Sequence, residues 1–387
     1  MTWREVSLKE ICEADWGNTN LTKSSYISDG KYLAVSAAGA DGLIDHYEHE
    51  ANVPVLSAIG AQCGRMFYPG SRFTAIKNTI TLTPKNDMAD GKFLYYLFTN
   101  VELPKRGAGQ PFISKGDIEA FRVPIPVSLE KQREIVEKLD NAFAEIDLLE
   151  ENLGLSEEKS SQLLKSLLSA SFSQAEAQSD SSNPSTTQEF AVKMVKLNEV
   201  CKLVGGGTPS KANSDYYFGE IPWATVRDLR SRWLEETEHH INQTAVRASS
   251  TNIIPAGNVV LASRVGLGKV VQLKQETAIN QDLRALIPKE DSKVDLNYLY
   301  YWALSIAPEI IAAGKGATVQ GVTLPFLENL RIPLPSLERQ REIVEKLDIA
   351  FAEIELLRHQ IKIGMAYASA LRQSLLSATF TQEEAVA

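Results

Sequence analysis

Cysteine is scarce in this sequence: Cys12, Cys63 and Cys201 are the only three among 387 residues, and no two of them form a CxxC pair. This spacing excludes a disulfide framework and favours core thiols in a reducing compartment. Long apolar runs are also missing, since no stretch approaches the roughly 20 residues that cross a bilayer. The opening residues, MTWREVSLKE, lack the pattern of a signal peptide. We therefore expect a cytoplasmic protein without membrane contact.

Motifs of catalysis and cofactor binding are missing as well. GGGTPSK at 205–211 has the glycines of a phosphate loop, but it lacks GxxxxGK(S/T) spacing, and Pro209 removes an amide that such a loop uses. His46 and His49 lack the further ligands of a zinc site. GxSxG and the Asn/Asp-Pro-Pro-aromatic signature of amino-methyltransferases do not occur. We expect no catalytic residue, no metal and no cofactor, so any enzymatic chemistry must come from other subunits.

Excess positive charge, the usual mark of a protein that binds nucleic acid, is also lacking, because the formal net charge is −9. The acidity is unevenly spread. Residues 1–127 carry 13 basic and 14 acidic side chains, and residues 194–334 carry 15 and 14. Residues 128–178 carry 5 and 11, and residues 335–387 carry 6 and 8. A nearly neutral segment can still gather its cations on one face, so total charge does not exclude DNA.

The acidic segments contain a repeat. QREIVEKLDNAFAEI (132–146) and QREIVEKLDIAFAEI (340–354) agree at 14 of 15 positions, and the offset of 208 residues holds without insertion from 128–172 to 336–380. One inserted residue would rotate everything after it on a helix by about 100°. A constant offset over such a length is therefore typical of a rod.

Each copy of the repeat is predicted to be a long helix. Each follows a Pro-x-Pro, which ends any preceding helix, and then Ser128 or Ser336 can cap the first turn. Apolar residues recur in steps of four and three, which indicates a coiled-coil seam. The seam positions are 135, 139, 142, 146, 149 and 153 in the first copy, and 343, 347, 350, 354, 357 and 361 in the second.

The segments before the helices also correspond, though faintly. LTPK (82–85) matches LIPK (286–289), and FLYYL (93–97) matches YLYYW (298–302). Their Gly, Pro, Thr and Val content with short apolar runs favours mixed, strand-rich domains with a few helices. We predict an α+β protein in which each globular domain precedes a long helix. The predicted parts are a first domain at 1–127, a helix at 128–173, a flexible polar linker at 174–190, a second domain at 191–335 and a helix at 336–381.

The globular segments resemble target recognition domains of a known family, the specificity subunits of type I restriction–modification systems. In the second segment the resemblance lies in GGGTPSKANSDYYFGEIPWATVRDL (205–229), LASRVGLGKV (261–270) and AINQDL (278–283). The first segment resembles a different class of such domain, through YLAVSAAGADGLIDHY (32–47), VLSAIGAQCGRMFY (55–68) and GQPFI (109–113). PSLERQREIVEKLD (335–348) resembles the start of the family's conserved helical regions.

This resemblance implies a function and partners. Each globular domain would read one half of a bipartite double-stranded DNA target, and the helices would pair antiparallel as a coiled-coil spacer. Two methyltransferase subunits would dock on the assembly, and restriction subunits would complete it, while this chain stays non-catalytic. Because the two domains resemble different classes, the target should be asymmetric. The first domain departs from the family's pattern at one place: AQCGR (61–65) stands where the family usually has a more basic glycine turn.

Polar side chains on the expected loops are the candidate DNA contacts. Arg, Asn and Gln can pair bidentately with base edges, whereas Lys more often holds phosphate. In the first domain they are Lys23, Tyr26, Arg65, Lys77, Asn78, Gln110 and Lys115. In the second they are Thr208, Ser210, Lys211, Arg227, Arg230, Arg232, Arg264, Lys269, Asn280, Gln281, Thr318 and Gln320. Each could instead be a solvated surface residue or a turn former. A stand-alone DNA-binding regulator and a coiled-coil scaffold without enzyme partners remain the alternatives.

Overall fold

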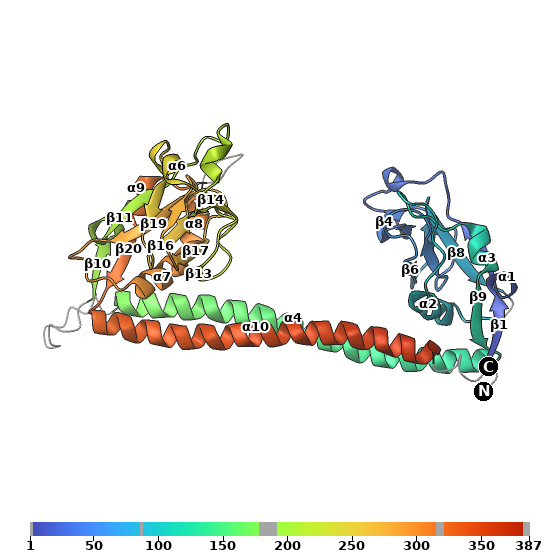
Figure 1. Cartoon of the computed structure of the whole chain (residues 1–387). Helices are drawn as coiled ribbons and strands as arrows, with labels where there is room; N and C mark the ends of the chain where they lie inside the picture. The colour runs from blue at the N-terminus through green and yellow to red at the C-terminus, as the bar shows by residue number, and fades with distance from the viewer. Residues whose placement is uncertain (1–2, 86–87, 178–191, 315–320, 382–387) are drawn as a thin grey trace. The chain divides into compact units, whose positions relative to one another are not determined.

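A computed structural model of the chain describes residues 3–85, 88–177, 192–314 and 321–381 (Figure 1). The chain forms two compact units. The first unit comprises residues 1–155 and 361–387, and the second comprises residues 156–360. In the described ranges, no helix has both the length and the hydropathy of a membrane span. Each unit combines sheets with helices, which confirms the predicted α+β class.

The first unit is built on three sheets. Short helices join them: α1 (Leu8–Ile11), η1 (Lys23–Ser25), α2 (Gly91–Asn100) and α3 (Lys115–Ala120). A two-stranded antiparallel sheet pairs β1 (Trp3–Ser7) with β9 (Arg122–Pro126). The four-stranded sheet has the order β2 (Cys12–Trp16), β8 (Thr79–Pro84), β5 (Val55–Ser57) and β6 (Met66–Phe67). The three-stranded sheet has the order β4 (Gly39–Ile44), β3 (Tyr32–Ser36) and β7 (Phe73–Ala75).

The second unit repeats this topology with two additional strands. β10 (Lys193–Lys196) pairs with β20 (Arg331–Leu334). The larger sheet has the order β11 (Cys201–Gly205), β19 (Leu283–Pro288), β16 (Val259–Ala262), β17 (Val270–Leu273) and β13 (Trp233–Leu234). The other has the order β14 (His239–Ile241), β12 (Ile221–Ala224), β18 (Thr277–Ile279) and β15 (Asn252–Ile254). Its helices are α5 (Leu197–Val200), η2 (Ser214–Tyr217), α6 (Gln243–Arg247), α7 (Leu296–Ser305), α8 (Ala307–Ala313) and α9 (Leu324–Asn329).

The equivalence of the units extends to single strand pairs. β3 runs parallel to β7 in the first unit, as β12 runs parallel to β18 in the second. The faint FLYYL and YLYYW match falls on α2 and α7, which are both capped by an aspartate, Asp90 and Asp295. Each carboxylate accepts hydrogen bonds from two amides of the first helical turn, which are otherwise left without partners.

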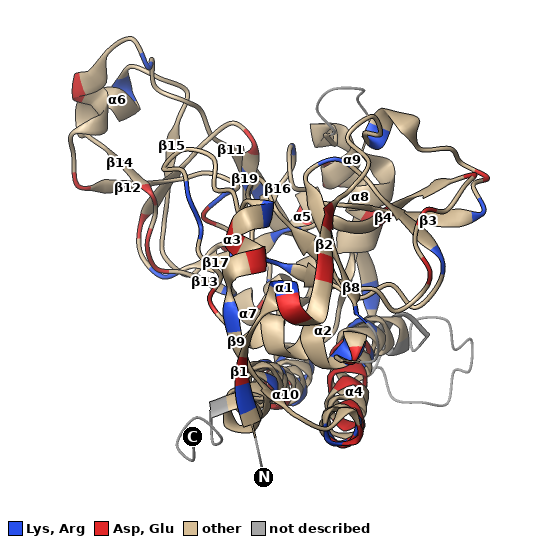
Figure 2. Ribbon diagram, turned by 90° about the vertical axis from the view of Figure 1, so that its right-hand side faces the viewer, with Lys and Arg blue, Asp and Glu red and all other residues tan. Residues whose placement is uncertain are grey.

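The two long helices are α4 (Leu129–Ala177) and α10 (Leu337–Thr381). α4 extends four residues beyond the predicted helix end at 173, because the first residues of the predicted linker, QAEA, are good helix formers. The remainder of the predicted linker, 178–190, lies outside the described residues. Acidic residues recur along α4 (Figure 2).

Within each unit, one part of α4 packs antiparallel against one part of α10. In the first unit, Gly364 lies against Leu153, whereas Arg372, eight residues later, forms ion pairs with Asp147 and Glu150. In the second unit, the Arg358 guanidinium donates to the Ser161 hydroxyl over 3.0 Å, and residues before Arg358 share a core with residues after Ser161. The antiparallel pairing of the two helices is therefore present in both units.

The predicted seam is correct for only part of each helix. Ile135, Leu139 and Ile146 are buried, but they belong to the first unit's core, to which Phe143, outside the predicted seam, also contributes. Leu149 and Leu357 are 42% and 41% exposed, so the seam assignment is wrong there. A four-and-three pattern does not tell a helix face that meets a globular domain from one that meets another helix, because both faces are apolar.

A buried glutamine at the same place in each repeat fastens each helix to its globular domain. Gln132 and Gln340 are both fully buried. The Gln132 side-chain oxygen accepts from the Asp90 amide over 2.8 Å, and its nitrogen donates to the Pro126 carbonyl over 3.1 Å. Gln340 makes the same contacts with Asp295 and Pro335, over 2.8 and 2.9 Å. A buried amide needs such partners, which explains why both copies keep Gln at this position.

An aspartate two turns further along each helix forms a second fastening point. Asp140 accepts from the Tyr96 hydroxyl over 2.5 Å and from the Lys92 ammonium over 2.7 Å. In the second unit, Asp348 accepts from the Tyr301 hydroxyl over 2.5 Å. Asn297 takes the place of Lys92 there, so the cation comes from another element.

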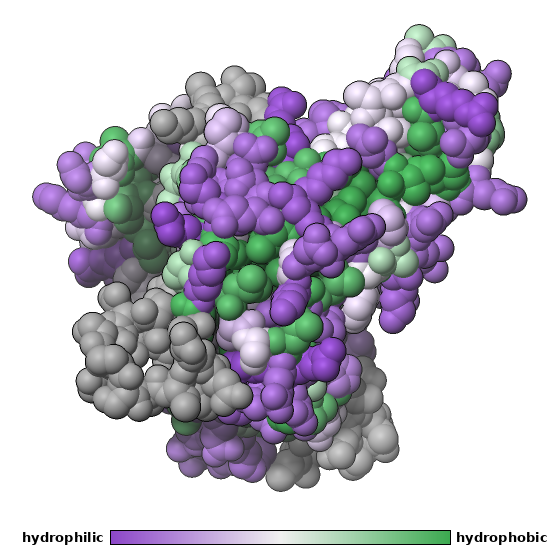
Figure 3. All heavy atoms as spheres, turned by 90° about the vertical axis from the view of Figure 1, so that its left-hand side faces the viewer, coloured by the Kyte–Doolittle hydropathy of each residue, from purple (hydrophilic) through white to green (hydrophobic). Residues whose placement is uncertain are grey.

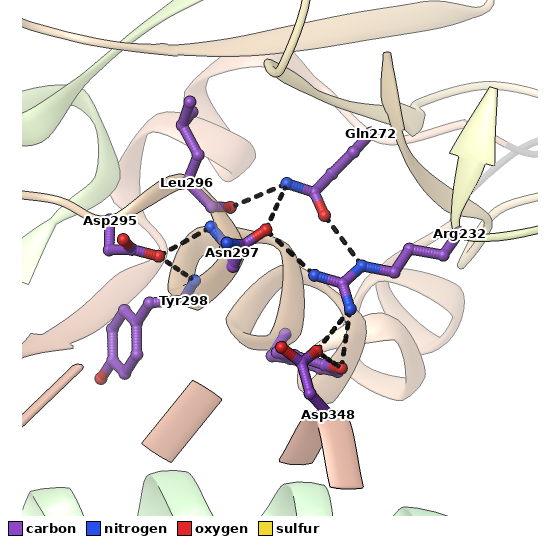
Figure 4. A network of polar contacts seen from close by, with 8 residues as sticks. Arg232, Gln272, Asp295, Leu296, Asn297, Tyr298 and Asp348 are labelled. Carbon is purple, nitrogen blue, oxygen red and sulfur yellow. Dashed lines mark hydrogen bonds and ion pairs between the residues drawn. The ribbon is translucent and has the colours of Figure 1, made fainter. Parts of the chain in front are cut away.

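That cation is Arg232, which immediately precedes β13 (Figure 4). Its guanidinium donates to Asp348 over 2.5 Å, to Gln272 over 3.0 Å and to Asn297 over 3.0 Å. It also lies over the rings of Tyr300 and Tyr301, each 5.0 Å from its centroid. Arg232 therefore ties the larger sheet of the second unit to α7 and α10.

Replacing Arg232 with Ala is expected to lower the free energy of unfolding of the protein by about 2 kcal/mol, because several charge-assisted hydrogen bonds disappear and Asp348 loses its cation. Urea denaturation followed by tryptophan fluorescence measures this loss. Arg230→Ala is the control, since Arg230 is exposed, and it should change the value by less than about 0.5 kcal/mol. Equal effects of the two variants would contradict the structural role of Arg232.

The three cysteines are free and buried, as the sequence predicts. Burial raises the pKa of the Cys12 and Cys201 thiols to about 12. These thiols are therefore protonated and unreactive in the folded protein.

Candidate nucleic-acid interface

A groove of the second unit has a volume of about 960 Å³ and lies where several loops meet. The loop after β11, the end of β12, and the β16–β17 and β18–β19 connections all contribute to it. It brings together five of the predicted contact residues: Thr208, Lys211, Arg227, Asn280 and Gln281. Cationic, amide and hydroxyl groups therefore converge on one hollow, as contact with base edges and phosphates requires.

A smaller groove of about 300 Å³ lies in the first unit. The loop after β2, the β3–β4 turn, and the β5–β6 and β7–β8 connections line it. It brings together three of the predicted contact residues, Lys23, Lys77 and Asn78. The four connections are the topological equivalents of those around the larger groove, so the two grooves occupy the same place in a shared fold.

The β18–β19 connection, Asn280 to Asp282, is held by its own side chains. Asn280 is only 6% exposed; its amide nitrogen donates to the Asp282 carboxylate over 3.1 Å, and its oxygen accepts from the Asp282 backbone amide over 3.1 Å. Gln281 is exposed, and its side-chain oxygen accepts a hydrogen bond from the Thr208 hydroxyl. Asn280 therefore shapes the loop, while Gln281 presents its amide to the groove.

A carboxylate outside the lining of the smaller groove, Asp41, holds two of the predicted contact residues. Asp41 accepts from the Lys23 ammonium over 2.5 Å, from the Tyr26 hydroxyl over 2.6 Å and from the Ser36 hydroxyl over 3.0 Å. Partial burial raises the pKa of the Asp41 carboxyl, but the hydrogen bonds from Lys23, Tyr26 and Ser36 outweigh it and keep that pKa below its ordinary value. Burial and the bond to Asp41 raise the pKa of Tyr26. Lys23 and Tyr26 are thus positioned by a charged acceptor.

Four predicted residues of the first unit do not line its groove: Tyr26, whose contacts with Asp41 are given above, and Arg65, Gln110 and Lys115. Arg65 lines a separate hollow of about 540 Å³, with its guanidinium 5.4 Å from the centroid of the Phe67 ring. The Lys115 ammonium, at the start of α3, forms an ion pair with Asp15 over 2.9 Å. Gln110 is exposed in the loop before α3. They stay proposed contacts that depend on how far bound DNA extends.

The remaining predicted residues of the second unit divide into three groups. One group is exposed: Ser210, Arg230, Arg264 and Lys269. Arg264 and Lys269 lie on the β16–β17 connection. The Arg264 guanidinium is 3.9 Å from the Asp282 carboxylate, and the Lys269 ammonium donates to the Val226 carbonyl over 3.1 Å. Arg232 is not part of the proposed interface, because its guanidinium donates hydrogen bonds to Asp348, Gln272 and Asn297. Thr318 and Gln320 lie outside the described residues.

Several groove residues were not predicted. Tyr217, Phe218, Trp223 and His239 give the larger groove an aromatic side, and Phe218 is 76% exposed at its edge. The cluster DYYF at 215–218, between polar loop residues, is the sequence signal that could have indicated them. Aromatic rings beside cationic and amide groups suit contact with nucleobases, which have apolar faces and polar edges.

A second hollow of the second unit, about 730 Å³, has a different character. Phe172, Trp302, Ile306 and Phe326 line much of it. Figure 3 shows apolar side chains exposed among hydrophilic ones on one face of this unit. The loop connections that form the larger groove do not contribute to this hollow, so it is not a counterpart of either groove.

Comparison with known proteins gives consistent results. A family model described as the type I restriction modification DNA specificity domain matches residues 1–154 and 191–364. The specificity subunit of the type I restriction enzyme EcoR124I/EcoR124II from Escherichia coli is 30% identical over 295 residues, which cover 73% of this chain and 67% of that protein. The EcoDI specificity subunit from the same organism is 23% identical over 418 residues, which cover 98% and 88%.

Solved structures share the fold. One comes from a study of complex assembly and conformational transition of the type I R-M system; it has a TM-score of 0.72 at 19% identity and covers 98% of this chain and 97% of its own. The HsdS subunit from Thermoanaerobacter tengcongensis has a TM-score of 0.54 at 20% identity, with 98% and 96% covered. Both likenesses extend over nearly the whole chain.

Proposed function

Because the chain belongs to the type I restriction–modification DNA specificity family, we propose that it recognises a bipartite DNA target for enzyme subunits that act on DNA. The observation that carries this proposal is the pair of grooves. They occupy equivalent places in two units of the same topology, yet they are lined by different side chains. Two grooves at equivalent places in the fold, lined by different side chains, suit two half-sites of different sequence. The target would therefore be asymmetric.

The long helices would act as the unread spacer of the target. They are acidic, so they suit contact with protein better than contact with phosphate. The similarity of the two helices is only partly explained by the buried Gln132 and Gln340 and by the partly exposed Asp140 and Asp348. Glu137 and Glu345 are exposed in equivalent places and identical in type, as are Lys138 and Lys346.

Repeated exposed residues would form two equivalent docking surfaces, one for each of two methyltransferase subunits. Leu148 on α4 and Leu356 on α10 are each 59% exposed, although large apolar side chains are usually covered in an assembled protein. Leu155 and Ile363, one heptad further along each helix, are 46% and 56% exposed. We name this face, with residues 141, 145, 148, 152 and 155 or their counterparts 208 residues later, the repeated stripe. Restriction subunits would then join the assembled methyltransferase.

The test compares the chain alone with the chain bound to methyltransferase. We expect the pure chain neither to methylate nor to cut DNA, and to show no binding of S-adenosylmethionine by calorimetry. Together with a type I methyltransferase subunit that co-purifies with it, the chain should direct methylation to one split, asymmetric sequence, found by mapping methylated sites. DNA binding without any co-purifying methyltransferase would instead favour a stand-alone regulator. Lack of DNA binding at low salt would favour a scaffold.

A further inference from the structure

The middle residue of one short connection has an equivalent position in each groove. These are Lys77, between β7 and β8, and Gln281, between β18 and β19. We infer that this position sets the base preference of each half-site, with Lys77 selecting guanine and Gln281 selecting adenine. The inference rests on the proposed function, because it identifies the residue by which each unit would read its DNA.

Three backbone hydrogen bonds around this position recur in the two units. Before the connection, the Ile76 amide donates to the Val35 carbonyl over 2.9 Å, and the Asn280 amide donates to the Ala224 carbonyl over 3.0 Å. After it, the Ala58 amide donates to the Asn78 carbonyl over 2.9 Å.

The second unit repeats this last bond as well, from the Ser263 amide to the Asp282 carbonyl over 2.8 Å. A third pair of bonds joins Asn18 to Ala75 over 2.8 Å and Gly207 to Ile279 over 3.0 Å. The two connections are thus fixed by matching hydrogen bonds from three neighbouring elements, and they hold their middle residues in equivalent places.

The residues on either side of the middle one are buried or hydrogen-bonded through the backbone, whereas the middle residues are exposed. Ile76 is 2% exposed and Asn280 is 6% exposed, so the residue before the middle is buried in each unit. The residue after it accepts a backbone hydrogen bond, and Asn78 has a φ of 73°, a left-handed conformation that Asn tolerates better than most residues. Lys77 and Gln281 are exposed in their grooves. An exposed side chain on a fixed backbone can vary between units without disturbing the fold.

The chemistry of the two side chains indicates different bases. Among the described residues, Lys77 bonds through its backbone amide, to the Leu21 carbonyl, and its ammonium has no hydrogen-bond or ion-pair partner. The ammonium is therefore free to donate to the paired acceptors N7 and O6 of guanine. The Gln281 amide offers a donor and an acceptor, which match N7 and the N6 amine of adenine. The Thr208 hydroxyl donates to its oxygen and fixes the orientation of the amide, while the second lone pair of that oxygen stays available. Thr208 is therefore a positioning residue.

The experiment exchanges the two side chains in the full chain. Purified wild type, Lys77→Gln and Gln281→Lys are each used to select duplexes at low salt from a library with two randomised half-sites. We expect Lys77→Gln to replace guanine by adenine at one position of the first half, and Gln281→Lys to make the opposite change in the second half. Each preference should shift by about tenfold or more. Lys159→Gln and Gln162→Lys on α4 carry the same changes of charge away from the grooves and should leave the motif unchanged.

The outcomes separate the inference from the proposed function. An unaltered half-site in each variant shows that the protein is folded. If wild type selects a split motif that the two exchanges leave unchanged, the inference is wrong and the proposed function stands. An even loss of affinity for all sequences in Lys77→Gln would make Lys77 a phosphate contact and overturn its assigned role. If wild type selects no motif, both the function and the inference fail.

Discussion

Replacing Leu148 and Leu356 together with Glu is expected to abolish binding of methyltransferase subunits to the chain. Each leucine is 59% exposed at an equivalent place on its helix, and a charge buried in either interface would have no partner. The loss should be about 3 kcal/mol or more at each site, which weakens binding more than a hundredfold. Size-exclusion chromatography with light scattering, on the chain mixed with its methyltransferase subunit, measures the effect.

The single variants make this prediction sharper. Leu148→Glu or Leu356→Glu alone should remove one of the two methyltransferase subunits and leave the other bound. Tyr367→Glu is the control: Tyr367 is 68% exposed on α10, but its counterpart on α4 is Lys159, so it does not belong to the repeated stripe. Loss of both subunits in a single variant, or loss in the control, would show that docking does not use two equivalent surfaces.

The repeat allowed much of the fold to be predicted from the sequence. A constant offset and the Pro-x-Pro before each copy place the start of both helices within one residue of their observed starts at Leu129 and Leu337. The buried Gln132 and Gln340 show why those copies stayed alike. The exposure of Leu149 could not be predicted, since the pattern of apolar residues does not say which neighbour covers them.

The grooves could be predicted only in part. Gln281, Lys77 and Lys211, which line the grooves, were identified because they are polar residues on expected loops. In the sequence, Arg232 looks like another polar loop residue. Its structural role arises because Lys92, which donates to Asp140 in the first unit, is replaced by Asn297 in the second, so Arg232 supplies the cation to Asp348. That compensation joins residues 116 positions apart, and one sequence contains no signal for it.

A fragment of residues 1–182 is expected to form a symmetric dimer that reads a palindromic target. In the intact chain, Leu376 and Phe380 of α10 complete the core of the first unit. Their counterparts on α4 are Leu168 and Phe172, the same residue types. A second fragment could therefore supply the missing helix, and a two-fold axis would place identical globular parts at equivalent positions. Both half-sites would then be those of the first unit.

The dimer should be weaker than the intact pairing, for reasons that the contacts specify. Ala368, fully buried in the first unit, is replaced by Ser160 in the self-pair. Arg372, which pairs with Asp147 and Glu150 and lies 4.8 Å from the Phe143 ring centroid, is replaced by Leu164. Each loss occurs twice in a symmetric dimer.

The variant Ser160→Ala/Leu164→Arg restores both features of α10 in the fragment. Its two restored ion-pair sites, each contributing about 0.5–1 kcal/mol, should tighten the dimer by about tenfold. Sedimentation velocity measures the dissociation constant of each fragment, and mapping of methylated sites in the presence of the methyltransferase subunit identifies the target. Ser160→Ala/Leu164→Glu is the matched control, because a carboxylate facing Asp147 and Glu150 should repel. A fragment that stays monomeric in every variant, or a dimer that still marks an asymmetric site, would show that the two helices are not interchangeable.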